Sequence, residues 1–491
     1  MIKKIAFLLF WGAVPALVFS QNYTISGYVK DKTTGEVLIG ANIYNAKKEN
    51  GTATNNYGFY SYTTDADSVT LVISYIGYAV ETVSFFLKEN VDLNIELRAG
   101  ESLQEIVVTA DERLEETTKM SRVIIPVQQI KSLPRFLGEV DVLKVLQMLP
   151  GVQSGTEGTS GFYVRGGGPD QNLMLLDGVP VYNAAHLFGF FSVFNADAIN
   201  NVELVKGGFP ARYGGRLSSV LDITMKEGNK EKIKGEGSIG LISSKLTLDG
   251  PINDKTTFLI SGRRTYLDIL ARPLLGFEEG ERVGYYFYDV NMKINHHFSE
   301  KNRIYLSSYF GDDKAFLRYK YEYESYSDEG EFGLSWGNFI GALRWNHIFT
   351  PKLFSNVTLT RSRYLFDIFD EYKELVTSNG NRDSYEYSIR YYSQIDDWAG
   401  KIDLQYVPSP DVDIKTGVSL TSHSFELGVL AVKDIDTTLG SKQTFGNEFF
   451  AYTEADIQLT KKLKINTGIH FSLFNVEKIK GQDNLRDYKN P

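Results

Sequence analysis

The stretch that decides the fold is FYVRGGGPDQNLMLLDGVPVYNAAHLFGFFSVFNADAINNVELVKGGFPARYGGRLSSVLDIT, residues 162–224. It contains short apolar runs at 173–176, 202–205 and 220–223, separated by glycine-rich turns. Runs that short, bounded by Gly and Pro, are typical of buried strands rather than helices. The segments before and after this block have different periodicities. We therefore expect a compact domain between two unlike neighbours.

Composition limits the function classes. The chain has 491 residues, enough for two to four domains, and a net charge of -9 with no basic stripe, which argues against a nucleic-acid partner. Aromatic residues make up 13% of the chain. They concentrate after residue 255, as in proteins with aromatic girdles at a membrane interface. The chain has no cysteine, which excludes disulfides and thiolate metal sites.

The N-terminus has the parts of a secretory signal peptide. Lys3 and Lys4 precede an apolar run at 5–19, and the small residue Ser20 stands just before Gln21. This pattern predicts a signal peptide at residues 1–20; the alternative is a buried N-terminal helix. Because Gln21, and not a cysteine, follows the predicted cleavage site, we expect no lipid anchor there. No later stretch has 18 uninterrupted apolar residues, which excludes a helical membrane protein.

Residues 22–97 read as six or seven short strands with turn signals about every ten residues, which predicts a small β-sandwich over 21–98. Residues 99–118 then change to an acidic segment with one apolar island, Ile106, Val107 and Val108. Such a segment cannot bury enough surface to fold alone, so it is predicted to be a tether. The island suits addition to the edge of a partner's sheet; the alternative is a last edge strand of the sandwich. A single helix is expected at 140–148.

After residue 226 the apolar residues recur with a period of two, most clearly at 463–474. This alternation fits either a sandwich facing water or a barrel with a lipid-facing exterior. The export signal and the aromatic residues near strand ends favour the barrel. So do the long connections expected at 318–330 and 429–442, which contrast with short turns at 300–302 and 350–351. We count ten or eleven strands, half of a barrel wide enough to hold a plug, so the chain is expected to be truncated or completed elsewhere.

Four motifs carry a family resemblance: LQEIVVTA (103–110), DVLKVLQMLPGV (141–152), FYVRGGGPDQNLMLLDGVPVYN (162–183) and NADAINNVELVKGGFPARYGGRLSSVLDITMKEG (195–228). Together they resemble a TonB-dependent outer-membrane receptor of the Bacteroidetes type. Residues 25–44, 54–62 and 72–78 resemble the carboxypeptidase-regulatory-like domain, a prealbumin-like β-sandwich. The expected fold is mainly β: this sandwich, an α/β plug at 119–226 and an incomplete antiparallel transmembrane β-barrel at 227–491.

The resemblance also implies partners and sites. The family's plug occludes its barrel, and an apolar box before the plug pairs with the inner-membrane energiser TonB. By position, the box is Leu103, Gln104, Glu105, Ile106, Val107, Val108 and Thr109. Outer-membrane lipid and a small or medium-sized imported ligand are further expected partners, with a surface lipoprotein as an additional candidate. No cofactor is expected.

Three plug arginines beside glycines are candidates for contacts with the barrel wall. Arg165, Arg212 and Arg216 could pair with wall acids such as Glu448 and Glu454 and hold the plug by charged hydrogen bonds that break under load. The alternative is that these arginines face water or bond locally. Asp170 and Asp177 fit ligand contact and turn chemistry equally well.

The function predicted is energy-coupled import of a siderophore, cobalamin, oligosaccharide or peptide across the outer membrane. One alternative is a ligand-binding or sensing protein without transport. The other is an exported peptidase, for which the HxxE pattern at His297 and Glu300 is the only signal. That pattern falls at a turn between strands without a third ligand, so no metal site and no catalytic residue is predicted.

Overall fold

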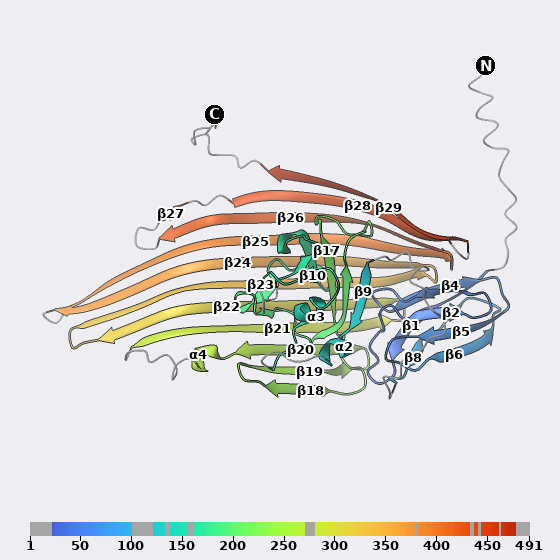
Figure 1. Cartoon of the computed structure of the whole chain (residues 1–491), viewed down its shortest axis with the longest axis horizontal. Coiled ribbons are helices and arrows are strands. Elements are labelled where there is room, and N and C mark those ends of the chain that lie inside the picture. Colours follow the sequence, from blue (N-terminus) through green and yellow to red (C-terminus); the bar gives the residue numbers. More distant parts are fainter. Residues whose placement is uncertain are drawn as a thin grey trace, which may run out of the picture.

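The computed structural model describes residues 22–100, 121–132, 138–155, 161–270, 280–378, 381–432, 437–439, 443–460 and 463–477. The predicted signal peptide and the predicted TonB box, Leu103 to Thr109, lie outside these residues. The molecule has three parts, which follow one another along the chain (Figure 1). Among the described residues, no helix has the length and apolar character needed to cross a membrane.

The first part is a β-sandwich of two small sheets, as the spacing of turns predicted. One sheet has the order β4-β1-β7, with β8 also paired to β1, and the other has the order β3-β2-β5-β6. Asn50 and Gly51, an Asn-Gly pair of the kind common in turns, begin β3 and pair with β2. The strands are β1 (Tyr23–Asp31), β2 (Asn42–Asn45), β3 (Asn50–Ala53), β4 (Phe59–Thr64), β5 (Ser68–Ser74), β6 (Glu81–Phe86), β7 (Val91–Asp92) and β8 (Ile95–Leu97).

The second part is the domain predicted to be the plug, built on a mixed sheet of order β13-β12-β17-β16-β9. The three apolar runs seen in the sequence form its central strands, β12, β16 and β17. The predicted helix is present but short, because Asp141 caps α3 at its start and the next turn ends at Pro150. The elements are β9 (Arg122–Pro126), α2 (Val127–Lys131), α3 (Val142–Leu146), β10 (Val152–Gln153), β11 (Tyr163–Val164), η2 (Pro169–Gln171), β12 (Asn172–Leu176), β13 (Val179–Pro180), β14 (Ala185–His186), η3 (Leu187–Gly189), β15 (Phe191–Ser192), β16 (Ile199–Val205) and β17 (Ser219–Met225).

The third part is one large antiparallel sheet, with consecutive strands paired from β18 to β29. Its main path has the order β18-β19-β20-β21-β22-β23-β24-β25-β26-β28-β29, which agrees with the predicted ten or eleven strands. In the described residues its edges, β18 and β29, do not pair, so the sheet is open. The elements are β18 (Lys234–Ile239), β19 (Ser243–Asn253), β20 (Thr256–Thr265), α4 (Leu267–Leu270), β21 (Glu281–Ser299), β22 (Asn302–Glu322), β23 (Tyr326–Thr350), β24 (Leu353–Ser378), β25 (Asn381–Ser409), β26 (Val412–Val432), β27 (Thr437–Leu439), β28 (Gln443–Thr460) and β29 (Leu463–Glu477).

The two long connections predicted at 318–330 and 429–442 are wrong in extent. β22 and β23 pair without interruption up to Glu322 and Ser327, and β26 continues to Val432. Residues 318–330 are rich in tyrosine and charged residues, a composition typical of loops. A paired strand nevertheless satisfies every backbone group, and its side chains can pair across the ladder, as Arg318 does with Glu331.

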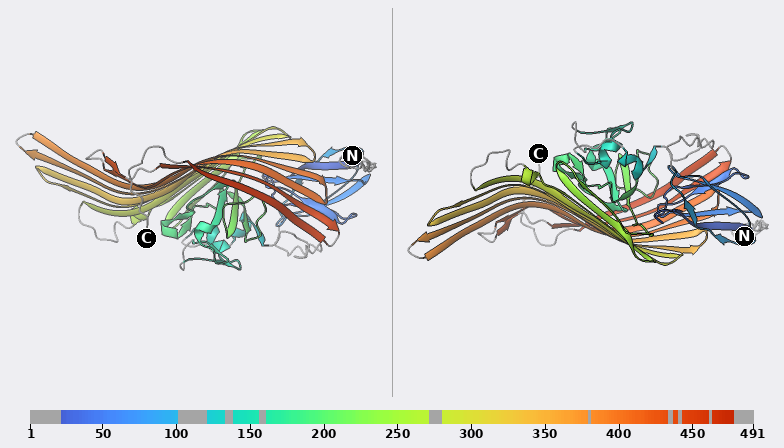
Figure 2. Two further views of the ribbon diagram at one scale, coloured as in Figure 1. Left: turned by 90° about the horizontal axis from the view of Figure 1, so that it is seen from above. Right: turned by 90° about the horizontal axis from the view of Figure 1, so that it is seen from below.

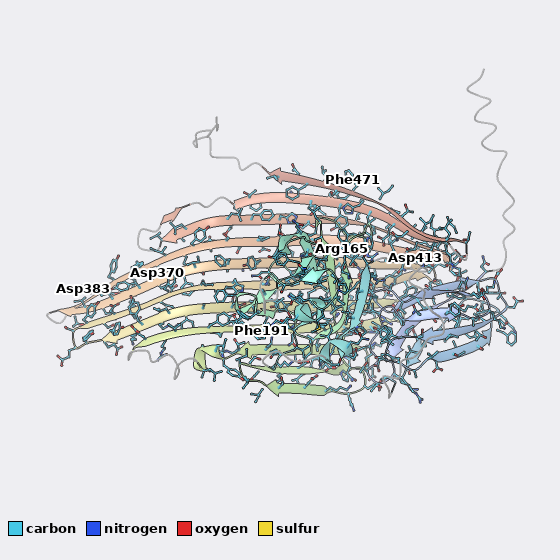
Figure 3. The ribbon with its side chains drawn as sticks, in the orientation of Figure 1. Arg165, Phe191, Asp370, Asp383, Asp413 and Phe471 are labelled. Atoms are coloured by element: carbon cyan, nitrogen blue, oxygen red, sulfur yellow. The ribbon has the colours of Figure 1, made fainter. Side chains whose placement is uncertain are left out.

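The sheet has two unlike faces, and the plug lies against one of them. We call this the plug-side face and the opposite one the outer face. On β21, Asn291, Lys293 and Asn295 point to the plug-side face and are at most 2% exposed, whereas the alternating Met292 and Ile294 are 46% and 42% exposed on the outer face. The neighbouring strands repeat this pattern with exposed outer-face Leu306, Leu343, Trp345, Leu359, Trp398, Ile402, Val418, Leu420, Phe449, Ile469 and Phe471. Phe471 is labelled in Figure 3.

Exposed apolar residues opposite a buried polar face are the reverse of the pattern in a water-soluble sheet, and they are typical of a sheet whose exterior faces lipid. The sheet curves around the plug at one end and bends in the opposite sense beyond it (Figure 2). The sandwich lies at the end where short turns join the strands (Figure 1).

Candidate functional site: the interface between plug and sheet

Asp177 joins the plug to the sheet through a buried ion pair. Asp177 and Gly178 form the two-residue turn between β12 and β13, and both have positive φ, 49° and 76°, as a type I′ hairpin requires. This turn directs the Asp177 carboxylate at Lys293, whose Nζ lies 2.9 Å from Oδ2, and both side chains are 2% exposed. Of the two possibilities that the sequence left open for Asp177, ligand contact and turn chemistry, the structure shows the turn.

Two further hydrogen bonds hold Asp177, one at its carboxylate and one at its backbone carbonyl. The backbone N–H of Met225 donates to Oδ1 at 2.9 Å, and Arg344 Nη2 donates to the Asp177 carbonyl at 2.6 Å. Burial alone would raise the pKa of Asp177, but Lys293 and Arg344 outweigh it and hold this pKa below its usual value. Asp177 is thus a charged anchor inside the interface.

A second buried cluster surrounds His186, the last residue of β14 in the plug. Its Nδ1 lies 2.5 Å from Asp313, its Nε2 lies 3.4 Å from Asp289, and its ring stacks on Phe287 at 4.1 Å between centroids. Burial would lower the pKa of His186, but Asp313 and Asp289 outweigh it and raise this pKa. The two wall carboxylates therefore favour the protonated form of His186.

Wall arginine Arg263 completes this cluster. It donates to Asp289 from Nε at 2.8 Å and from Nη2 at 2.6 Å, and Nη2 also donates to the carbonyl of Ser192 in the plug at 2.9 Å. One guanidinium thus orients a wall acid and binds the plug backbone at the same time.

A third cluster lies next to the second, because Lys245 of β19 is the register partner of Arg263 of β20. Asp197 accepts from Lys131 of α2 at 2.5 Å and from Lys245 of β19 at 2.7 Å. Burial would raise the pKa of Asp197, but these two lysines outweigh it and lower this pKa. Charged contacts therefore hold the plug at several separate points of the wall.

Of the predicted arginine contacts, the structure brings together Arg212 and Glu454. Arg212 Nη1 lies 2.5 Å from Glu454 Oε1, and the backbone N–H of Arg212 donates to Oε2 at 3.1 Å. Burial would lower the pKa of Arg212, but Tyr213 and Glu454 outweigh it and raise this pKa well above its usual value.

The other two predicted arginines bond within the plug. Arg165 Nη2 donates to Ser121 Oγ at 2.7 Å, and Arg216 Nη1 donates to the carbonyl of Gly215 at 2.8 Å. Glu448 lies 3.6 Å from wall residue His423, and it lines the same open cavity as Arg165 and Arg216. In this structure Arg165 and Arg216 therefore form local hydrogen bonds, which is the alternative stated for them.

β9 is the first strand of the plug domain that follows the predicted box in the sequence. It forms the edge of the plug sheet and pairs only with β16, from Arg122↔Val205 to Pro126↔Asn201. At its start, Arg122 grips Glu203 of β16 with two bonds, Nε to Oε1 at 2.5 Å and Nη2 to Oε2 at 2.7 Å. A pull on the preceding segment would load the bonds of Ser121 to Arg165 and Lys206 and then this pair.

The sandwich docks on the same wall below the plug. The Arg303 guanidinium lies 3.2 Å from the centroid of the Tyr28 ring, and Phe354 stacks on Phe59 at 5.2 Å. Phe354, Phe59 and Val37 belong to one buried apolar cluster. The sandwich and the plug therefore contact the same face of the large sheet.

Our sequence reasoning missed Lys293, Arg263, Asp289 and His186. A signal was available: the three wall residues occupy polar positions of otherwise apolar alternating strands, which is where a plugged sheet must carry its interior charges. His186 gave no signal, since its role depends on two acids more than 100 residues away.

A plug domain held by buried charges against the polar face of a sheet with an apolar exterior defines a plugged receptor of the outer-membrane type. Family models support this class. Residues 25–108 match the CarboxypepD_reg-like domain, and residues 115–219 match the TonB-dependent Receptor Plug Domain.

Curated relatives match the same region. The TonB-dependent receptor SusC of Bacteroides thetaiotaomicron is 28% identical over 246 residues, which is 47% of this chain and 23% of that protein. The Ferrienterobactin receptor of Escherichia coli K12 is 29% identical over 152 residues, which is 25% of this chain and 20% of that protein. The matched regions thus span about a quarter of each relative or less.

Among solved structures, the ferric-catecholate import receptor Fiu of E. coli K12 superposes with a TM-score of 0.50 at 16% identity, over 74% of this chain and 57% of that chain. At that identity the likeness supports the fold alone. The chain therefore carries a CarboxypepD_reg-like domain followed by a TonB-dependent receptor plug domain, and it resembles the TonB-dependent receptor SusC.

Proposed function

We propose that this protein takes up a ligand across the outer membrane of a Gram-negative bacterium, with energy supplied by TonB. The observation that carries the proposal is the plug itself: a folded domain is held by buried ion pairs against the polar face of a sheet with an apolar exterior. Such a domain blocks passage until work is done on it.

The apolar exterior supports a place in the membrane, with lipid as the partner of the outer face. The short turns and the sandwich would then face the periplasm, because outer-membrane barrels have short turns on that side. The opposite end would receive the ligand, and a surface lipoprotein remains a candidate partner there.

The work must come from outside the chain, since its sequence contains no nucleotide-binding P-loop. We propose that TonB pairs with the box at Leu103 to Thr109 by strand addition. Force on this segment would reach β9 at the edge of the plug sheet and break the Arg122–Glu203 pair before the anchors at Asp177 and His186.

The box is tested by Val107→Pro, with Val107→Thr as the matched control. Proline cannot donate the backbone hydrogen bond that strand addition needs, whereas threonine keeps both the bond and the branched side chain. TonB-dependent uptake and co-purification with TonB should fall at least about tenfold in the proline variant and stay unchanged in the threonine variant.

Equal uptake and equal TonB binding by Val107→Pro would refute the box assignment. Retained ligand binding without energised uptake in the wild-type protein would favour the sensing alternative.

A further inference from the structure

The large sheet reverses the character of its faces beyond the plug. We call this part the distal segment: residues 281–287 of β21, 313–322 of β22, 326–336 of β23, 366–376 of β24 and 383–393 of β25. Within the distal segment these strands pair residue by residue without a register shift. The plug-side face therefore continues without interruption into the distal segment. Asp370 and Asp383 mark its position, away from the plug (Figure 3).

On the distal segment the plug-side face is apolar and aromatic. Leu317, Phe332, Ile389 and Tyr391 are between 38% and 54% exposed there. The other apolar and aromatic residues with this alternation are Val283, Tyr285, Tyr319, Leu334, Trp336, Phe366, Ile368 and Tyr387. A few residues away, where the same face of these strands contacts the plug, it is polar.

Every lysine and arginine of the distal segment lies on the outer face: Arg282, Lys314, Arg318, Lys320, Lys373 and Arg390. Most pair with acids on that face, as Lys314 does with Glu331 at 2.7 Å and Lys373 with Glu386 at 2.6 Å. The plug-side face of the segment therefore has no cation.

Asp313 at the boundary with the plug pairs with His186, whereas three acids farther out on the plug-side face have tyrosines as partners. Glu281 accepts from Tyr321 at 2.7 Å, Asp370 from Tyr387 at 3.3 Å and Glu374 from Tyr372 at 3.2 Å. Uncompensated carboxylates among apolar side chains attract a cation and repel an anion.

The plug adds one exposed ring to this surface. Phe188 is 61% exposed, and its ring centroid lies 5.0 Å from that of Trp336 and 5.9 Å from that of Tyr285. Leu187 and Phe188 both have positive φ, 49° and 53°, which non-glycine residues adopt only where their surroundings impose it. Here the Leu187 N–H is held by Tyr285 Oη at 2.6 Å and by Asp313 at 2.9 Å.

We infer that Phe188 and the plug-side face of the distal segment form the ligand-binding surface, and that its ligand carries apolar groups and no net negative charge, as an apolar cationic peptide does. The inference rests on the import function proposed above and adds the chemical class of the ligand. A ligand bound there touches the strained loop of the plug directly, which connects occupancy to the domain that must move.

The test uses the full chain in phosphatidylcholine nanodiscs and three labelled hexapeptide amides. The first contains leucine, phenylalanine and lysine. In the second, glutamate replaces lysine, and in the third, serine replaces leucine and phenylalanine. Fluorescence anisotropy, corrected with empty discs, should show the first peptide binding at least about tenfold more tightly than the other two.

Variants at neighbouring positions of β23 locate the site. Phe332→Lys puts a cation on the plug-side face and should weaken binding of the first peptide about tenfold, whereas Ser335→Lys puts the same cation on the outer face and should leave it unchanged. Phe188→Ala should also weaken binding, without any change to the wall.

Binding of the glutamate or serine peptide as tight as that of the first would overturn the inference, as would equal signals from loaded and empty discs. Because binding is measured without TonB, such a result leaves the proposed import function standing, and failure of the Val107→Pro test leaves this binding unaffected.

Discussion

Removal of the Lys293 charge should release the plug. In Lys293→Met the Asp177 carboxylate stays buried, 2% exposed, without the ammonium group now 2.9 Å away. Loss of one partner of a buried ion pair costs about 3–5 kcal/mol. Because Arg344 and the Met225 N–H still bind Asp177, we take the lower value, about 3 kcal/mol, which raises the population of the undocked plug about a hundredfold.

The natural chain has no cysteine, so one introduced thiol reports on docking. Ala342→Cys is suitable because Ala342 lies on the wall, 3% exposed, in the same apolar cluster as the plug core. In detergent at moderate urea, the thiol should react with maleimide about a hundredfold faster when Lys293→Met is added. Arg318→Met is the control, since it removes a cation from an exposed outer-face pair and should change the rate little.

Adding Asp177→Asn to Lys293→Met removes the unpaired charge, and asparagine tolerates the positive φ at this turn. In the double variant the maleimide reaction should slow again, most of the way to the rate seen without Lys293→Met. If Lys293→Met reacts no faster than the wild type, the buried pair does not hold the plug, and the electrostatic account of the interface is wrong.

Two further predictions concern the plug interior and the sandwich. Burial, with Glu203 nearby, raises the pKa of Asp222 from 3.8 to about 6, so between these pH values the native plug binds more protons than the unfolded chain. Its free energy of unfolding should therefore fall as the pH rises from about 4 to about 6, and Asp222→Asn, but not the exposed Asp170→Asn, should remove that part of the pH dependence of the urea midpoint. Phe354→Ala should weaken the docking of the sandwich on the large sheet by about 3 kcal/mol. This weaker docking should be seen as faster labelling of Val37→Cys, which lies in the same cluster. Phe349→Ala, at a side chain 54% exposed, should leave the labelling rate unchanged. Unchanged pH dependence in Asp222→Asn, or equal labelling with Phe354→Ala, would contradict the respective argument.

The sequence by itself determined the three-part order and the class of each part. Period-two alternation after residue 226 predicted an antiparallel sheet with unlike faces, and glycine-bounded apolar runs predicted the buried strands of the plug, because both patterns depend on neighbours along one strand. The Asp177–Gly178 turn was readable for the same reason.

Only the tertiary structure decided the contacts between parts. Lys293 pairs with Asp177, 116 residues earlier, and His186 with Asp289 and Asp313, because the sheet curves around the plug and brings those side chains together. The tertiary structure also decided that the plug-side face is apolar on the distal segment. A pattern of period two shows that two faces differ, but which one meets the plug is set by the packing of domains that are distant in the sequence.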